Sequence, residues 1–365
     1  MNLNDTPEYA LLRHAARAEM SPEEQAAFRE ACDGVDWPTV LQLAAYHRLV
    51  PLLYVHLRDY APDLAPDATT QILRGAAMER AMQVLFLSSE LKQIATAFDD
   101  VDVPFLVLKG PSLAEAFGDA SRRPFVDNDF LIRREDFSRV ESVLRGMGFL
   151  RWKKSQRQQN GYLYIHGEYS FGRAIGSQVS TADVHVDLVP RGYAYHLPFA
   201  DLQRRSRRLQ TTGVDVPVLS WEDLFVALSV NALKDQWNRL RLVSDLAEVG
   251  KLVDWPLLWD LADQASCRRA VGLAVVLAVD ELGAELPAAA VGPAKADART
   301  VDLAEHIRTH FRTFHDAPVL DIKDRIRLTL LAQDDVWSQV RYTSFVALRR
   351  VMEPLVDPGT ETEVD

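Results

Sequence analysis

The sequence predicts an α+β fold in which a small mixed sheet is flanked by amino- and carboxy-terminal helical regions. Apolar residues recur at three- and four-residue spacing before about residue 99 and again after residue 220, which is typical of amphipathic helices. Between these regions, short β-rich runs alternate with a helical pattern and with glycines. We therefore expect a helical region over residues 1–98, an α/β core over 99–218 and a carboxy-terminal helical domain over 219–365.

The helical regions carry clear start signals. Ser21-Pro22-Glu23-Glu24 offers Ser as an N-cap and Pro in the first turn of a helix. Asp36-Trp37-Pro38 begins the next helix, and further helices are expected to start near Ser220 and at Asp254-Trp255-Pro256.

The core is expected to contain short strands and a helix between two of them. The helix is expected over 134–146, and the strands over 105–108, 130–132, 162–165, 168–171 and 183–188. Glycines punctuate the segment from 162 to 188, which favours antiparallel pairing there.

Composition indicates a globular protein of the cytoplasm. Apolar residues make up 48% of the chain and charged residues 25%. The two cysteines, Cys32 and Cys267, lie far apart, so we expect no disulfide framework, no zinc site and a reducing compartment. The first residues lack the basic and apolar stretches of a signal peptide, and no apolar run is long enough to cross a bilayer, so we expect no membrane partner.

The net charge of −11 argues against nucleic acid as a partner, because such binding depends on clustered Lys and Arg. A nucleotide remains possible as a ligand, since a local positive patch is enough to attract its phosphates.

A pair of carboxylates opens one of the expected strands. Asp127 and Asp129 are separated by one residue and therefore point to the same face of a strand, with their Cα atoms about 7 Å apart. Adjacent carboxylates repel each other unless a cation lies between them. Mg²⁺ is commonly held by one or two carboxylates together with substrate phosphates. The pair is therefore a candidate metal site, with a solvated strand start as the alternative.

The turn that precedes this pair has the composition of a phosphate-binding site. An apolar strand breaks at Gly110, and the backbone N–H groups and the Ser112 hydroxyl at the start of the next helix are suited to bind phosphates. Pro111 removes one N–H donor from this turn. Lys109 and Arg123 are the nearest candidate cations for a triphosphate. The alternatives are that Gly110 ends a strand, that Ser112 caps the helix and that Arg123 pairs with a surface aspartate.

Motifs in the core and on both sides of it resemble those of the uncharacterised nucleotidyltransferase family, within the DNA polymerase β-type nucleotidyltransferase superfamily. No single motif is specific, but their order and spacing are, and the resemblance extends over roughly residues 38–290. It is carried chiefly by His47-Arg48-Leu49-Val50-Pro51-Leu52-Leu53-Tyr54, Leu108-Lys109-Gly110, Asp127-Asn128-Asp129, Ala182-Asp183-Val184-His185 and Trp237-Asn238-Arg239-Leu240-Arg241.

The resemblance implies a metal-dependent nucleotidyltransferase that moves a nucleoside monophosphate from a nucleoside triphosphate, ATP among the candidates, to a small-molecule or protein/peptide acceptor. It implies Mg²⁺ or Mn²⁺ held by Asp127, Asp129 and a third carboxylate. Asp183 and Asp187 lie on one face of a strand with His185 between them, and the family's Asp-Leu-His strand favours Asp183. His185 is then a proton carrier beside the acceptor, or a hydrogen-bond partner of a carboxylate.

The site is expected between the α/β core and the carboxy-terminal helices, because ligand pockets favour domain interfaces. Lys234 is then a further candidate for nucleotide binding, with a solvated helix position as its alternative. Two departures from the family pattern, Asn128 and Pro111, leave a second function open. In that alternative the protein is a catalytically idle nucleotide-binding or helical interaction protein on the same fold.

Overall fold

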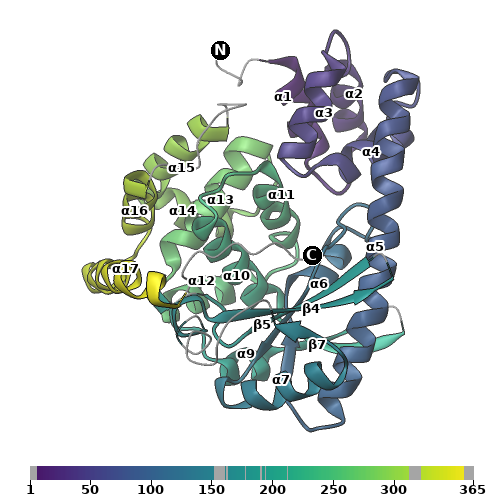
Figure 1. The fold of residues 1–365 in the computed structure, drawn as a ribbon. Helices are drawn as coiled ribbons and strands as arrows, with labels where there is room; N and C mark the ends of the chain where they lie inside the picture. Colours follow the sequence, from purple (N-terminus) through teal and green to yellow (C-terminus); the bar gives the residue numbers. More distant parts are fainter. Residues whose placement is uncertain are drawn as a thin grey trace.

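The computed structural model describes residues 6–356 apart from 152–160, 162, 177, 190, 194, 212 and 312–321. Within these residues the fold is α+β, with one mixed sheet and helices before and after it, as the sequence predicts (Figure 1). The amino-terminal helices are α1 (Pro7–Ala15), α2 (Pro22–Ala31), α3 (Trp37–Tyr46), α4 (Val50–Tyr60) and α5 (Asp67–Asp99). The carboxy-terminal helices are α10 (Trp221–Lys234), α11 (Leu240–Val249), α12 (Trp255–Gln264), α13 (Arg268–Leu282), α14 (Ala288–Ala296), α15 (Ala298–Phe311), α16 (Ile322–Leu331) and α17 (Val336–Val356).

The expected helix starts are confirmed. Ser21 forms a capping box with Glu24, and the side chains of Asp36, Ser220 and Asp254 each accept a hydrogen bond from a first-turn N–H. Each cap satisfies a backbone donor that has no partner within its helix.

The middle of the chain forms a seven-stranded sheet in the order β3-β4-β5-β2-β1-β7-β6. Its strands are β1 (Phe105–Val107), β2 (Asn128–Ile132), β3 (Leu150–Arg151), β4 (Glu168–Ile175), β5 (Gln178–His185), β6 (Arg207–Thr211) and β7 (Val214–Val218). The helices between them are α6 (Lys109–Ala116), α7 (Phe137–Gly146) and α9 (Phe199–Arg205). β2 pairs with β5 in parallel, and β1 pairs with β7 in parallel, while the other neighbours are antiparallel.

The strand expected at 162–165 is wrong. Residues 163–166 are helical, and Tyr162 lies outside the described residues. The N–H of Gly167 donates to the carbonyl of Leu163, and Gly167 has a φ of 74°. This left-handed glycine ends a helical turn, so it marks the end of a helix rather than a break between two paired strands.

Successive side chains of each strand point to opposite faces of the sheet, and each face packs against a different set of helices. Phe130, Ile132 and Val184 belong to the core that α5 and α7 complete on one face. Leu131, which alternates with them, belongs to the core shared with the amino- and carboxy-terminal helices on the other. Asp129 has the same parity as Leu131 and therefore faces the helical side.

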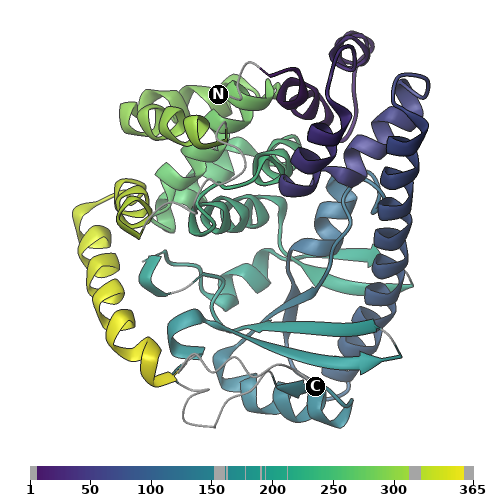
Figure 2. The same ribbon diagram turned by 45° about the horizontal axis from the view of Figure 1, so that its top comes forward.

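The amino- and carboxy-terminal helices lie next to each other (Figures 1 and 2), and both contribute residues to that second core. The Tyr9 hydroxyl lies 2.8 Å from Oε1 of Glu281, and the N–H of Ala18 lies 3.0 Å from Oε1 of Glu248. α5 contributes Leu73 to this core and Leu91 to the core on the opposite face of the sheet. One helix therefore links both layers. None of the helices in the described part of the chain combines the length and the hydropathy needed to cross a membrane.

Candidate active site

The aspartates predicted to bind metal lie on β2 and β5 at neighbouring positions. Asp127 directly precedes β2, Asp129 lies within it, and both take the face directed at the helices. The parallel register pairs Asp129 with Asp183 of β5, so the two Cα atoms lie one strand spacing apart, about 4.8 Å. Asp187 follows β5 and is paired with Arg134 instead. The fold thus brings Asp183, rather than Asp187, level with the β2 aspartates.

The Asp129 carboxylate is held by two partners. Oδ1 lies 3.0 Å from Nε2 of His185, and Oδ2 lies 3.8 Å from Nζ of Lys109. Burial alone would raise the pKa of Asp129, but Lys109 and then the His185 hydrogen bond hold it well below its ordinary value. Asp129 raises the pKa of Lys109 in return. This carboxylate is therefore ionised and oriented.

The other two aspartates are shifted in the opposite direction. Burial, followed by the charge of Asp129, raises the pKa of Asp127 to about 6. Burial also raises the pKa of Asp183; a hydrogen bond from Ser170 acts against this, and the charge of Asp129 adds a smaller increase. Asp183 Oδ1 is buried and has no hydrogen-bond partner among the described residues. Three carboxylates thus lie close together in a largely desolvated place, where repulsion between them adds to the effect of burial.

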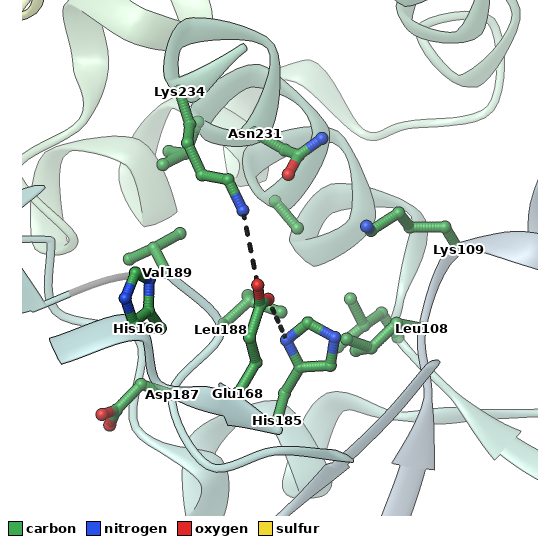
Figure 3. Close-up of a pocket in the computed structure, with 13 residues that line it drawn as sticks. Leu108, Lys109, His166, Glu168, His185, Asp187, Leu188, Val189, Asn231 and Lys234 are labelled. Carbon is green, nitrogen blue, oxygen red and sulfur yellow. Dashed lines mark ion pairs between the residues drawn. The ribbon is translucent and has the colours of Figure 1, made fainter. Parts of the chain in front are cut away.

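Glu168 of β4 extends this network to the helices (Figure 3). β4 pairs with β5 so that Glu168 lies opposite His185, and Oε2 of Glu168 is 3.3 Å from Nδ1 of His185. The other oxygen is 4.0 Å from Nζ of Lys234, which reaches down from α10. His185 therefore lies between two carboxylates, one on each ring nitrogen. This geometry favours the orienting role of His185 over that of a free proton carrier.

The predicted phosphate-binding turn is the first turn of α6. Lys109 opens the helix, and Gly110 and Ser112 are buried within its first two turns. A Cβ on Gly110 would lie 2.9 Å from Cγ of Phe125, so this position requires glycine for close packing. Leu108 is the N-cap and provides no side-chain cap. Ser112 Oγ is buried without a hydrogen-bond partner among the described residues, so it does not cap α6.

Arg123 lies beside this turn but is already paired. Its Nε and Nη2 lie 2.5 and 2.7 Å from the two carboxylate oxygens of Asp245 in α11, and Nη1 donates to the Pro124 carbonyl at 2.9 Å. The side chains of Arg123 and Asp245 are 9% and 4% exposed. The partner is Asp245 rather than a surface aspartate, and the geometry favours a structural role that joins the loop before β2 to α11.

A cleft of about 170 Å³ lies between the sheet and helices α10 and α11. Its lining joins residues from all three regions of the chain: Arg48, Lys109, Gly110, Arg123, Phe125, Val126, Asp127, Asp129, Leu228, Asn231, Asp235, Asn238, Arg239, Arg241, Leu242 and Asp245. A smaller cavity of about 20 Å³, with room for about one water molecule, adjoins it and is lined by Lys109, Glu168, His185 and Lys234 among others. Most of the candidate residues thus line these two adjoining cavities, next to the helices, but Asp183 and Ser112 are not among the lining residues.

The model of the uncharacterised nucleotidyltransferase family matches residues 33–283. The chain belongs to this family. Among solved structures, it is similar to an antigenic nucleotidyltransferase-like protein from Paracoccidioides brasiliensis, with 16% identity and a TM-score of 0.37, over 56% of this chain and 96% of that chain. No curated protein matches the chain. Membership in the family supports nucleotidyl transfer as the general activity.

Asn128, which departs from the family pattern, lies on the opposite face of β2 from the carboxylates. Its Nδ2 donates to the Leu87 carbonyl in α5 at 2.9 Å. The residue therefore anchors the strand to α5 and does not enter the cleft. Pro111 is the third residue of α6, where its missing N–H leaves those of Lys109 and Gly110 unaffected.

Sequence reasoning assigned no role to Glu168 or Arg48. Glu168 was visible only as the first residue of an expected strand, and its importance depends on the register between β4 and β5. Arg48 and Arg239 belong to motifs that resemble the family, but they are 191 positions apart in the numbering and meet only in the folded cleft. No local pattern in the chain links such positions.

Proposed function

We propose that the protein transfers a nucleoside monophosphate from a nucleoside triphosphate to a small-molecule or protein/peptide acceptor, with Mg²⁺ or Mn²⁺ as cofactor. The observation that carries the proposal is the β2–β5 register, which sets Asp183 beside Asp129 and next to Asp127. Asp127 and Asp129 line a cleft that also presents basic side chains. Family membership supports the same reaction class.

The donor set fits a hard divalent cation, which prefers carboxylate oxygens. Burial and mutual repulsion raise the pKa values of Asp127 and Asp183, and a nearby cation would relieve both effects. Asp183 Oδ1 also offers an acceptor without a partner among the described residues. Nevertheless, no group of three His, Cys, Asp or Glu side chains in the described part of the chain is already arranged to hold a metal ion. We therefore assign Asp127, Asp129 and Asp183 as ligands that come together when substrate binds.

The metal would supply positive charge that neutralises the triphosphate and stabilises the transition state of phosphoryl transfer. The protein's own residues bind and orient the substrate. The first turn of α6 offers N–H groups, the positive end of the helix dipole and the Lys109 ammonium for phosphate oxygens. Lys234 at the end of α10 and the Ser112 hydroxyl are the further candidates for nucleotide binding.

His185 orients a carboxylate in this proposal. Its Nε2 bond to Asp129 fixes one oxygen of Asp129, and its contact with Glu168 fixes the imidazole ring. The other oxygen of Asp129 remains near Lys109 and available to a cation. A proton-carrying role for His185 would require it to exchange one of these contacts for the acceptor.

The test compares Asp183→Asn with Asp187→Asn in the full chain. Calorimetric titration with ATP, GTP, CTP and UTP in Mg²⁺ measures nucleotide binding, and mass spectrometry of reactions with candidate acceptors detects a nucleoside monophosphate adduct. Asp183→Asn should weaken Mg²⁺-dependent nucleotide binding by roughly tenfold or more and abolish the adduct. Asp187→Asn removes a carboxylate of the same strand segment and should change neither.

The same measurements address the alternative of a catalytically idle or interaction protein. Mg²⁺-dependent nucleotide binding without an adduct on any acceptor would favour an idle nucleotide-binding protein. The absence of nucleotide binding by the wild-type chain would contradict both nucleotide-dependent functions and leave the interaction protein.

A further inference from the structure

Two arginines from distant parts of the sequence line the same cleft as Asp127 and Asp129. Arg48 belongs to the connection between α3 and α4, and Arg239 is the N-cap of α11. In the described part of the chain, neither is ion-paired with a carboxylate, and Arg239 Nε is buried without a hydrogen-bond partner. Two further arginines line the cleft. Arg123 is fully engaged with Asp245, and Arg241 donates from Nη2 to the Pro124 carbonyl at 3.4 Å. Arg48 and Arg239 are therefore available to a ligand.

Arg48 occupies a strained backbone position. Its φ is 57°, in the left-handed region that favours Gly or Asn. It follows α3, and the turn is closed by bonds from the N–H of Arg48 to Ala45 and from that of Leu49 to Ala44. An Arg side chain does nothing to stabilise a left-handed backbone conformation, unlike the short polar side chain of Asn. Strained positions of this kind cluster at functional sites, and Gln236 and Trp237, just before Arg239, also have positive φ values.

His47 fixes the two arginines relative to each other. It is 1% exposed, and its Nδ1 accepts a hydrogen bond from the N–H of Leu240 at 3.1 Å. Each bonded residue is the direct neighbour of one arginine. Burial and the charge of Arg239 lower the pKa of Arg48, although Asp235 and Asp127 act in the opposite direction. The fold thus holds two like charges near each other, an arrangement that an anion would stabilise.

We propose that Arg48 and Arg239 form a binding site for the terminal phosphates of a nucleoside triphosphate. The identity of the ligand rests on the proposed function, but the binding of a polyphosphate does not require transfer to occur. Guanidinium groups suit this role because each one presents a planar fork of donors to phosphate oxygens. The amino-terminal helices would then contribute directly to the nucleotide site, through a residue outside the sheet and its helices.

The test uses inorganic tripolyphosphate as probe, titrated calorimetrically into the full chain in metal-free buffer. Arg48→Asn removes the charge and places a residue that tolerates positive φ at this turn. Arg239→Gln removes the second charge. Arg58→Gln is the matched control, because Arg58 lies on the exposed surface of α4, is ion-paired with its neighbour Asp59 and does not line the cleft.

We expect Arg48→Asn and Arg239→Gln each to weaken tripolyphosphate binding by roughly tenfold or more, and Arg58→Gln to leave it unchanged. The thermal midpoint of Arg48→Asn should equal or exceed that of the wild type, because the backbone strain is relieved. Loss of binding together with a lower midpoint in both variants would overturn the proposal, since the arginines would then be structural. Wild-type binding in Arg48→Asn, or no binding by the wild type, would also overturn it.

These outcomes separate this site from the proposed reaction. If tripolyphosphate binding depends on Arg48 but no adduct forms with any acceptor, the phosphate site stands and nucleotidyl transfer fails. If adducts form at the wild-type rate and with the wild-type KM for the nucleotide in Arg48→Asn, transfer stands and the phosphate site fails.

Discussion

Removing the carboxylate of Asp245 should destabilise the protein by about 3–5 kcal/mol. Asp245 accepts two charge-assisted hydrogen bonds from Arg123, at 2.5 and 2.7 Å. Bonds to charged groups contribute about 1.5–3 kcal/mol each. In Asp245→Ala the buried guanidinium would keep only the Pro124 carbonyl, and breaking a buried pair in this way typically costs about 3–5 kcal/mol.

The chain supplies a control pair of the same geometry at the surface. Arg58 binds Asp59 through Nε at 2.6 Å and Nη2 at 2.9 Å, but these side chains are 54% and 31% exposed. Because solvent screens exposed pairs, Asp59→Ala should cost only about 0–1 kcal/mol. Bidentate contact is common to both pairs, so the difference between the two variants measures the effect of burial.

Urea unfolding followed by circular dichroism and tryptophan fluorescence gives both free energies. A double variant, Arg123→Met with Asp245→Leu, should recover most of the loss, because it replaces a broken buried pair with apolar contacts. If Asp245→Ala costs no more than Asp59→Ala, the reasoning is refuted. Arg123 would then be loosely held and available to a triphosphate, as the sequence alone predicts.

Three further changes test other parts of the fold and the site. Burial, with Arg239, lowers the pKa of His47 from 6.5 to about 4, so as pH falls the unfolded chain is protonated at this residue before the folded protein is. The free energy of unfolding should therefore fall by up to roughly 3 kcal/mol between pH 6.5 and pH 4. Urea unfolding at a series of pH values checks this, because the free energy of unfolding of His47→Gln should depend less on pH over this range. Gly110→Ala should destabilise by about 1–3 kcal/mol in urea unfolding, since its Cβ would meet the Phe125 ring; an unchanged midpoint would contradict this. Asn128→Leu should change stability by no more than about 1 kcal/mol and leave Mg²⁺-dependent nucleotide binding intact in calorimetry, because the side chain faces α5; loss of binding alone would show that it acts in the cleft.

The parts of the fold that depend on local chemistry could be predicted from the sequence. Ser21, Asp36 and Ser220 mark helix starts because their side chains bind first-turn N–H groups, an effect confined to four residues. That Asp127 and Asp129 point to the same face of the sheet follows from the alternation of side chains along a strand. The prediction of a strand over 162–165 was wrong because a pattern of four residues is too short to distinguish a strand from a helical turn. Gly167, with its positive φ, was the signal of a helix end.

Features that depend on strand register and on long-range packing could not be predicted in the same way. The sequence left Asp183 and Asp187 open because both take the same face of the strand expected over 183–188, and only the pairing of β5 with β2 sets Asp183 level with Asp129. The partner of Arg123 lies 122 positions away in the sequence, and no pattern near Arg123 points to it. Whether the three predicted regions are separate domains stays a prediction.

The position of the amino-terminal helices bears directly on that prediction. A separate domain would keep its own core and meet its neighbour through a modest interface. Here Tyr9 binds Glu281, Ala18 binds Glu248, and both helical regions fill one continuous core. His47 also holds the backbone at Leu240, one residue after Arg239 of the cleft. Displacing these helices would therefore remove Arg48 from the cleft and loosen the turn that carries Arg239. The amino-terminal region thus forms part of the lining of the cleft and supports another part of it.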